Sequence, residues 1–293
     1  MGSWHPECPE RLDAINDHLL SSGILPLLDT LDDPRPATEQ EILRVHTPTH
    51  LQYLKKLSPT DGYAAIDGDT SMNPFTLQAA FEAAGAGIAA VDAVMAGTTR
   101  SAFCSVRPPG HHAESGRAMG FCFFNNVAVA AAHALDHYGL KRVAIIDFDV
   151  HHGNGTEEIF SDEPRLMMCS FYQHPFYPNT RLEETPENMV NIPVDAYTTG
   201  FDLRQLVSDV WVPRLVDFSP ELLLVSAGFD GHREDEMGQL GMSESDYAWI
   251  TDQLVQVAER SAHGRIVSML EGGYNLSALG RSVVAHIRSL SKL

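Results

Sequence analysis

The sequence has few cysteines and no pair of them at metal-binding spacing. Its 293 residues contain four: Cys8, Cys104, Cys122 and Cys169. Most of them stand among apolar residues, where a free thiol behaves as a small hydrophobic group. The spacing argues against a disulfide framework and against a cysteine-based metal site, and it indicates a reducing compartment. Because the start, MGSWHPECPE, has no features of a signal peptide, we expect a cytoplasmic protein.

Positive charge and long apolar runs are also scarce. Lysine and arginine number 20 against 39 aspartates and glutamates, which gives a formal net charge of −19. Phosphate binding needs the opposite sign, so the composition argues against nucleic acid as a partner and favours a cationic substrate. No apolar run approaches the ~20 residues that a membrane span needs, and we expect no membrane association.

Strand-like and helix-like segments alternate along most of the chain. Six apolar runs are predicted to be strands: 101–106, 142–150, 166–171, 191–194, 221–227 and 265–270. Helices are predicted around them: 10–22, 39–46, 48–57, 75–97, 126–138, 154–160, 200–217, 243–262 and the C-terminal segment. This alternation indicates an α/β fold with a mostly parallel sheet in a single domain, residues 1–293. Such sheets bind ligands at the carboxyl ends of their strands.

Metal-ligand side chains gather where the second and fifth predicted strands end. Asp147, Asp149 and His151 are spaced by two, so an extended chain presents them on one side. Burying these groups together without a cation would cost free energy through desolvation and charge repulsion, and a bound metal ion would offset that cost. Asp230 follows the fifth strand and is the natural third ligand. The set Asp149, His151 and Asp230 suits Zn²⁺, although ligand type alone leaves Fe²⁺ and Mn²⁺ open.

Candidates for proton transfer and oxyanion binding follow the first and last predicted strands. The loop RPPGHHAE contains His111 and His112, and a histidine near a metal site can take a proton from water and return it to a leaving amine. Asp147 and Asn154 are candidate partners that orient these rings. The turn EGGY places Tyr274 where it could donate a hydrogen bond to a developing oxyanion.

Together, these motifs resemble the zinc-dependent histone deacetylases. HPECPERL, RPPGHHAE, GFCFFNN, IDFDVHHGNG, SAGFD and EGGY occur in that family's order, and the resemblance covers about residues 5–285. The similarity is to the class II branch and its bacterial deacetylase-like and acetylpolyamine amidohydrolase relatives. It implies an arginase-like α/β fold with a sheet of about eight strands. It also places a strand before HPECPERL, whereas this chain begins almost at that motif.

The resemblance implies an activity and a role for each candidate residue. The reaction would be zinc-dependent hydrolysis of N-acetylated amines, most plausibly acetyl-lysine in proteins or peptides, with hydroxamates as inhibitors. One Zn²⁺ per chain would be bound by Asp149, His151 and Asp230. The catalytic set would be His112 as general base and acid, His111 as its electrostatic neighbour, Asp147 and Asn154 as their partners, and Tyr274 as the group that polarises the carbonyl.

A substrate tunnel and a potassium site are implied in the same way. The tunnel would be lined by Gly120, Phe121 and Tyr177, with tyrosine in place of the usual phenylalanine at the last position, and by Met237 at its mouth. Relatives that prefer acetylated polyamines often carry glutamate at the mouth, so Met237 favours acetyl-lysine. Residues 172–190 are expected to set specificity. Potassium would lie near Asp147, Asp149, His151, Ser170 and Phe171, largely on main-chain oxygens.

The sequence alone leaves other functions open. An acetylpolyamine amidohydrolase is the nearest alternative. An arginase-like ureohydrolase needs a second metal and further carboxylates, and the sequence offers a single Asp-x-His motif after a strand. A non-catalytic, metal-stabilised binding protein would be expected to have lost the paired histidines or Tyr274. The acyl-chain length, the native metal and the oligomeric state are not determined by the sequence.

Overall fold

A parallel sheet of six strands forms the centre of the computed structural model, which describes residues 1–2, 4–181 and 186–293. The strands are β3 (Ser101–Cys104), β4 (Val143–Asp147), β5 (Leu166–Gln173), β6 (Met189–Val194), β7 (Leu222–Ala227) and β8 (Ile266–Leu270). Their order is β3-β8-β7-β4-β5-β6, and every neighbouring pair is parallel. The six apolar runs are confirmed as strands. The count of about eight implied by the resemblance is wrong for the described residues.

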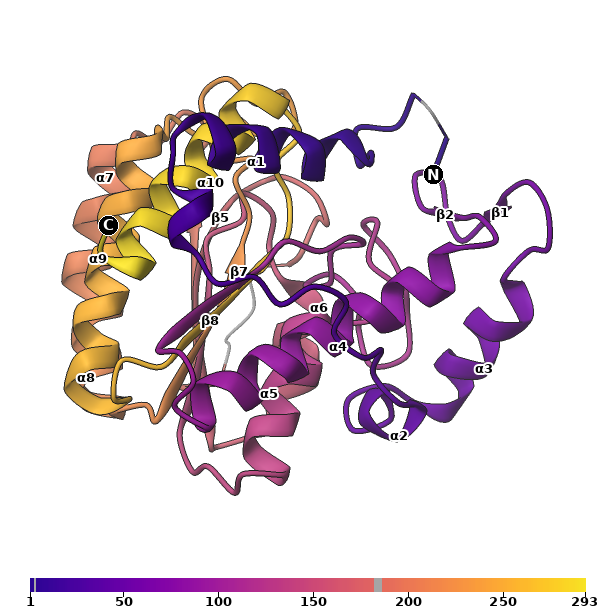
Figure 1. Ribbon diagram of the computed structural model, residues 1–293, viewed down its shortest axis with the longest axis horizontal. Helices are drawn as coiled ribbons and strands as arrows, with labels where there is room; N and C mark the ends of the chain where they lie inside the picture. Colours follow the sequence, from indigo (N-terminus) through magenta and orange to yellow (C-terminus); the bar gives the residue numbers. More distant parts are fainter. Residues whose placement is uncertain (3, 182–185) are drawn as a thin grey trace.

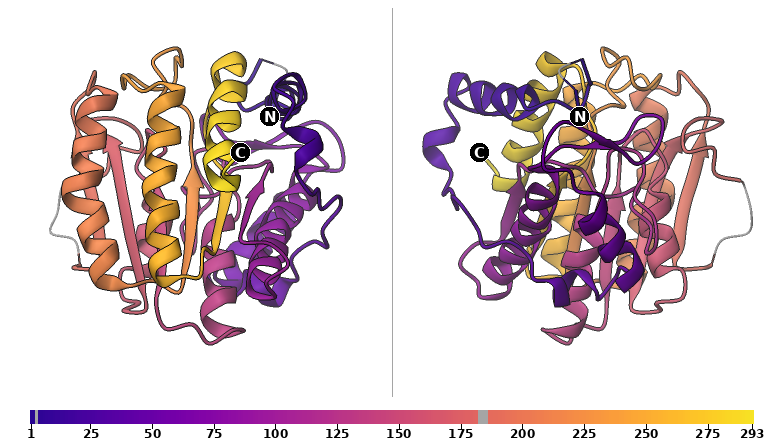
Figure 2. Two further views of the ribbon diagram at one scale, coloured as in Figure 1. Left: turned by 60° about the vertical axis from the view of Figure 1, so that its left-hand side comes forward. Right: turned by 90° about the vertical axis from the view of Figure 1, so that its right-hand side faces the viewer.

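Helices cover both faces of this sheet and make a three-layer structure (Figures 1 and 2). One face is covered by α4 (Thr76–Met95), α5 (Asn126–Asp136) and α6 (Asn154–Phe160), with α2 (Glu39–Ile42) and α3 (Pro48–Leu57) beyond them. The other is covered by α7 (Gly200–Leu206), the π-helical turn η2 (Val207–Trp211), α8 (Val212–Phe218), α9 (Glu244–Ser261) and α10 (Leu276–Ser291). α1 (Glu10–Ser21) packs on α10 and is followed by the 3₁₀ turn η1 (Leu25–Leu27). A two-residue antiparallel pair, β1 (Ala64–Ala65) and β2 (Ser71–Met72), lies in the loop before α4.

Alternate residues of each strand enter different hydrophobic cores. In β4, Val143 and Ile145 pack with α4 and α5, whereas Ala144 and Ile146 pack with the helices of the opposite layer. Burial on both faces explains why the strand sequences are almost continuously apolar. The same alternation puts the side chain of Asp147 on the α5 side of the sheet, where the strand ends.

Several elements are shorter than the sequence predicted. β3 ends at Cys104 and β4 ends at Asp147, because the chain leaves the sheet there to form the loops of the site. The segment 39–46 is helical only to Ile42. The segment 200–217 is one helical run, but a π-helical turn interrupts its α-helical hydrogen bonding.

α4 corrects the expectation that no segment reaches the length and hydropathy of a membrane span. By length and composition alone it is the one helix of the described residues that does so, with a mean hydropathy of 1.3 and half of that window buried inside the fold. A core helix passes the same test. Gly85 faces the backbone of residues 35–37, and Gly87 faces Met269 of β8, so both lie where a side chain would collide. The contacts of α4 are therefore those of a core helix.

Candidate metal centre and active site

The polar motifs of the sequence converge at the carboxyl ends of the strands, as the sheet topology requires. The loop after β3 carries the paired histidines and the loop after β4 carries the Asp-x-His motif. The loop after β7 carries Asp230 and the turn after β8 carries Tyr274. Since β3, β8, β7 and β4 are consecutive in the sheet, four segments distant in sequence meet at one place.

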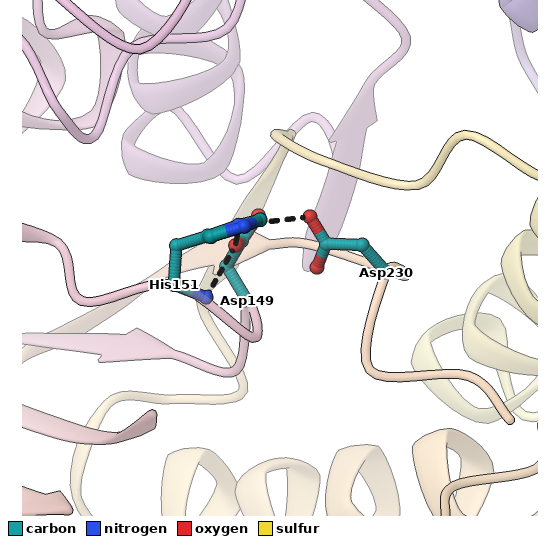
Figure 3. A group of neighbouring side chains, drawn as sticks. All are labelled: Asp149, His151 and Asp230. Carbon is teal, nitrogen blue, oxygen red and sulfur yellow. Dashed lines mark hydrogen bonds and ion pairs between the residues drawn. The ribbon is translucent and has the colours of Figure 1, made fainter. Parts of the chain in front are cut away.

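Asp149, His151 and Asp230 form a buried cluster with one ligand atom from each residue within 4.8 Å of the others (Figure 3). Nδ1 of His151 lies 3.0 Å from Oδ1 of Asp149 and 3.3 Å from Oδ2 of Asp230. Among the described residues this is the only group of three or more such side chains placed to hold an ion. The predicted ligand set is therefore assembled, with two oxygens and one imidazole nitrogen.

The surroundings of this cluster fit a cation. Oδ2 of Asp230 is buried without a hydrogen-bond donor and faces Nδ1 of His151 at 3.3 Å, so it is able to accept a cation. Although burial alone would lower the pKa of His151, Asp149 and Asp230 raise it to about 10. Burial and the charge of Asp149 raise the pKa of Asp230 to about 6. The site thus favours a positive charge between its carboxylates, and two carboxylates with one imidazole are a donor set that Zn²⁺ accepts.

Glycines allow the carboxylates to lie against the neighbouring turn. A Cβ at Gly272 would overlap Oδ2 of Asp230, and a Cβ at Gly228 would overlap the carboxyl group of Asp149. The amide of Gly272 donates a hydrogen bond of 2.9 Å to Oδ2 of Asp149. Gly228 of SAGFD and Gly272 of EGGY are therefore needed for close approach.

His111 is held by Asp147 beside the metal ligands. Its Nδ1 lies 2.9 Å from Oδ2 of Asp147, and its Nε2 lies 3.8 Å from Oδ2 of Asp149. Burial opposes a charge on this ring, but the two carboxylates outweigh burial and raise the pKa of His111 well above its ordinary value. His111 is therefore suited to be the cationic member of the pair.

His112 has the opposite electrostatic environment. Its Nδ1 lies 2.8 Å from Oδ1 of Asn154, a neutral partner. Burial, followed by the charges of His111 and His151, lowers the pKa of His112 well below its ordinary value. The rings of His111 and His112 lie 4.0 Å apart between centroids. Two adjacent histidines thus have pKa values shifted in opposite directions, an arrangement that separates a charged group from a neutral base.

Two of the predicted tunnel residues, Gly120 and Tyr177, lie against His112. The ring of Tyr177 meets that of His112 edge-on at 5.1 Å between centroids, and a Cβ at Gly120 would overlap the His112 ring and lie 3.0 Å from the Tyr177 hydroxyl. The ring of Phe121 lies 6.0 Å from that of Tyr274. Met237 is half-buried, and its amide donates to Asp235. Within segment 172–190, residues 182–185 lie outside the described part of the chain.

The turn that carries Tyr274 is fixed by residues that the sequence reasoning missed. Nε of Arg11 donates to the carbonyl of Gly273 at 2.7 Å, and its guanidinium lies 4.9 Å from the centroid of the Tyr274 ring. Oδ2 of Asp235 accepts from the amide of Tyr274 at 2.6 Å. Desolvation is the main cause of a raised pKa for the Tyr274 hydroxyl, which keeps that group protonated. The signal for Arg11 was present in HPECPERL, but the sequence gives no distance between it and EGGY.

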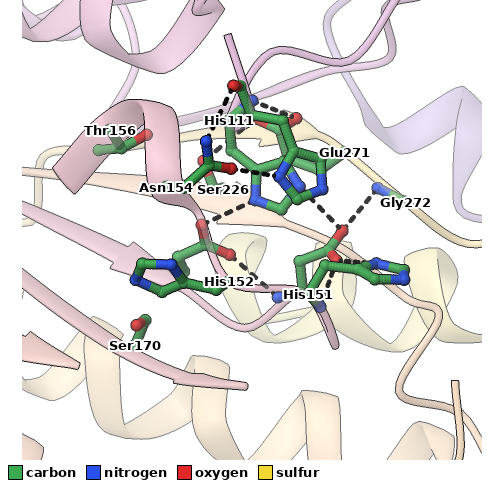
Figure 4. A network of polar contacts seen from close by, with 12 residues as sticks. His111, His151, His152, Asn154, Thr156, Ser170, Ser226, Glu271 and Gly272 are labelled. Atoms are coloured by element: carbon green, nitrogen blue, oxygen red, sulfur yellow. Dashed lines mark hydrogen bonds and ion pairs between the residues drawn. The ribbon is translucent and has the colours of Figure 1, made fainter. Parts of the chain in front are cut away.

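Glu271 was also missed, although it begins the EGGY turn (Figure 4). Its Oε2 accepts from the amides of Gly110 at 2.7 Å and His111 at 3.1 Å, and its Oε1 accepts from the hydroxyl of Ser226 at 3.1 Å. Burial raises the pKa of Glu271 to about 7. This carboxylate joins the loop of the paired histidines to the β8 turn.

The residues implied for potassium lie on neighbouring strands. Ser170 pairs with Asp147 in the register of β4 and β5, and its hydroxyl donates to Asn191 at 2.9 Å. The ring of Phe171 stacks on Trp211 in the core of the opposite layer. These contacts do not test an ion on the main-chain oxygens, so the potassium site stays a prediction.

Comparisons with known proteins agree on one family. Residues 5–290 match the family described as "Histone deacetylase domain". The chain is 36% identical to "Histone deacetylase 14, chloroplastic" of Arabidopsis thaliana over 98% of this chain and 73% of that protein. It is 38% identical to "Polyamine deacetylase HDAC10" of Mus musculus over 97% of this chain but only 44% of that protein. A crystal structure of the HDA15 HD domain superposes with a TM-score of 0.92 at 34% identity, covering 100% of this chain and 87% of that one.

Proposed function

Because the chain belongs to the histone deacetylase family, whose members are zinc-dependent hydrolases, we propose that it removes acetyl groups from acetyl-lysine in peptides or proteins and releases acetate. We propose that residues 1–293 act as one catalytic domain in the cytoplasm. The observation that carries the proposal is the neutral His112 held beside the buried cluster of Asp149, His151 and Asp230. It combines a metal site with a base of suitable charge state.

Asp149, His151 and Asp230 are the residues that would hold the zinc ion. When bound, zinc polarises a carbonyl oxygen and lowers the pKa of water toward ~7. The chain's own contribution is to hold both carboxylates desolvated and in a fixed position. The amide of Gly272 bonds to Asp149, and the amide of Val150 donates to Oδ1 of Asp230 at 3.0 Å, so both carboxyl groups are fixed before any ion binds.

His112 is the proposed general base. Asn154 accepts at its Nδ1, which leaves Nε2 as the free base nitrogen. The base takes a proton from the attacking water and gives it to the departing amine. His111, held charged by Asp147, stabilises the negative charge that develops nearby, and Tyr274 donates a hydrogen bond to the oxyanion.

Two features favour acetyl-lysine over an acetylated polyamine. Met237, the residue that we propose for the tunnel mouth, offers no charge to a second ammonium group. Nearby Glu234 pairs with Arg281 at 2.8 Å, so its charge is already compensated. The tunnel walls, Phe121 and Tyr177, suit an alkyl chain of either substrate.

The same residues give less support to the alternative functions. A ureohydrolase needs two metals, and the part of the chain that the structure describes offers a single ligand cluster. A binding protein without activity would have no need to keep His112 neutral and bonded to Asn154. The acetylpolyamine reaction shares the proposed site, and the relative named as a polyamine deacetylase keeps it as the second candidate.

The test is a comparison of kcat/KM for an acetyl-lysine peptide and N-acetylputrescine, with a hydroxamate as inhibitor. The proposal predicts hydroxamate-sensitive release of acetate, faster from the peptide. A preference for N-acetylputrescine would make an acetylated polyamine the substrate and leave the proposed deacetylation reaction unchanged. No release of acetate from either compound by zinc-loaded protein would contradict the reaction itself.

A further inference from the structure

The amide of Asn154 can present either of its ends to His112, and the two orientations have opposite consequences. With the oxygen toward Nδ1, His112 carries its proton on Nδ1 and Nε2 is free to act as a base. With the nitrogen toward Nδ1, that ring atom must accept, the proton moves to Nε2, and the base is lost. Asparagine alone does not decide between these orientations.

A carboxylate on the other side of Asn154 decides the orientation. Oε1 of Glu114 lies 2.9 Å from Nδ2 of Asn154, while Oδ1 of Asn154 lies 2.8 Å from Nδ1 of His112. An ionised carboxylate only accepts hydrogen bonds, so the amide atom that faces it must be the nitrogen. We infer that Glu114 is a positioning residue that locks the amide of Asn154 and thereby sets the tautomer of His112. This inference rests on the proposed role of His112 as base.

The other neighbours of the amide nitrogen are too weak to replace Glu114. The carbonyl of His112 lies 3.5 Å from Nδ2 of Asn154, at the limit of hydrogen bonding. The sulfur of Met119 also lies 3.5 Å from Nδ2, but a thioether is a weak acceptor. A charged acceptor at 2.9 Å is the stronger partner, because bonds to ionised groups are roughly twice as strong as neutral ones. Without Glu114 the amide would have no strong reason to keep its nitrogen on this side.

The main chain of Glu114 is held independently of its side chain. Its amide donates to Arg117 at 2.9 Å, and its carbonyl lies 3.0 Å from Nδ1 of His46. The carbonyl of His111 accepts from the amides of Gly155 at 3.1 Å and Thr156 at 3.3 Å, at the start of α6, which carries Asn154. Removing the carboxylate of Glu114 therefore leaves these contacts of the loop in place.

Donor and acceptor logic predicts a pattern of rescue. Asn154→Asp puts two carboxylates face to face, so the new aspartate must turn away or take up a proton, and turnover should fall. Adding Glu114→Gln to this variant supplies an amide nitrogen that donates to the aspartate, whose other oxygen then accepts from His112. The double variant should recover turnover that the single variant lost, which a general structural role of either residue would not produce.

Four zinc-loaded proteins and one matched control make the experiment: wild type, Glu114→Leu, Asn154→Asp, Asn154→Asp with Glu114→Gln, and Glu158→Leu. Glu158 accepts from the amide of Ser115 at 2.8 Å and from its hydroxyl at 2.7 Å, so it bonds the same loop from α6 without touching Asn154. Turnover is measured on the peptide and on N-acetylputrescine. Side-chain ¹⁵N NMR of labelled histidines reports which nitrogen of His112 carries the proton.

We expect Glu114→Leu to lower kcat by ~10²-fold, the order of a general-base contribution, with KM and zinc content little changed. Its His112 should move from the Nδ1–H to the Nε2–H form, and Glu158→Leu should behave as wild type. A wild-type tautomer in Glu114→Leu, or equal rates for Asn154→Asp and the double variant, would overturn the inference. If the wild type releases no acetate, the proposed function fails, and the NMR spectra still decide the role of Glu114.

Discussion

Nε of Arg11 donates a hydrogen bond of 2.7 Å to the carbonyl oxygen of Gly273, which lies 262 positions later in the chain. The guanidinium also donates to the carbonyl of Glu271 and contacts Glu7, and it is completely buried. Because Gly273 precedes Tyr274, this bond ties the start of the chain to the turn that carries a proposed catalytic residue. The start of α1, which carries Arg11, is thus a part of the site rather than a peripheral element.

Arg11→Met should therefore lower both stability and turnover. The substitution leaves two buried carbonyl groups without their donor, which we expect to cost about 2–4 kcal/mol in the free energy of unfolding. The same change at Arg165, whose ion pair with Glu163 lies at the surface, should cost less than about 1 kcal/mol. Urea unfolding measures the loss of stability in both variants, and steady-state kinetics measures the turnover of Arg11→Met. Equal losses for the two variants would remove the special role of Arg11.

Tyr274→Phe tests the oxyanion donor. The ring and its contact with Arg11 are kept, so only the hydroxyl is lost. We expect kcat to fall by ~10²-fold or more, the usual effect of removing such a donor, while the zinc content stays the same. Steady-state kinetics on metal-analysed protein measures this, and unchanged turnover would exclude Tyr274 from the mechanism.

Gly120→Ala tests the close contact between the tunnel and the base. The backbone of Gly120 has φ of +55°, and its Cβ would overlap the ring of His112, so the ring must move. We expect turnover to fall by ~10-fold or more, since a displaced base loses much of its contribution. Gly116→Ala, in open space on the same loop, is the matched control. If both variants keep wild-type kcat, the placement of Gly120 against His112 is wrong.

The pH dependence of stability should reflect His46, which supports the loop of the paired histidines. Its Nε2 accepts from the amide of Asn125 at 2.9 Å, and burial lowers its pKa to about 3 from an ordinary value of 6.5. Since the folded pKa is lowered, the unfolded chain binds this proton first, and its contribution to stability is lost as pH falls from 6.5 toward 3. The loss is at most about 1.4 kcal/mol per pH unit.

Urea unfolding at pH 7, 6 and 5 checks this for the wild type and His46→Gln. The wild type should start more stable and lose stability more steeply over that range. Parallel pH profiles for the two proteins would show that His46 does not contribute as described.

The sequence predicted the sheet and the ligand set because both depend on local patterns. Continuous apolar runs mark strands buried on two faces, and the Asp-x-His spacing determines which side chains share one side of a strand. The convergence of His112 and Asp230 followed from the topology, since the carboxyl ends of parallel strands share one edge.

The sequence could not predict the residues that support this set. Arg11 and Glu271 are 260 positions apart and meet through folded packing, which no local pattern encodes. Glu114 stands two positions after the paired histidines, but its role depends on its distance from Asn154, 40 positions later. The strand count implied by the resemblance exceeded the count of apolar runs, and the runs gave the better number for the described residues.

We propose that Asp149, His151 and Asp230 hold the ion on which deacetylation depends. The measurement is acetate release from an acetyl-lysine peptide by the wild type and by Asp230→Ala, each with its zinc content determined. We expect the wild type to bind zinc and release acetate in a hydroxamate-sensitive reaction, and Asp230→Ala to lose zinc and activity together. Stoichiometric zinc and undiminished release in Asp230→Ala would contradict it.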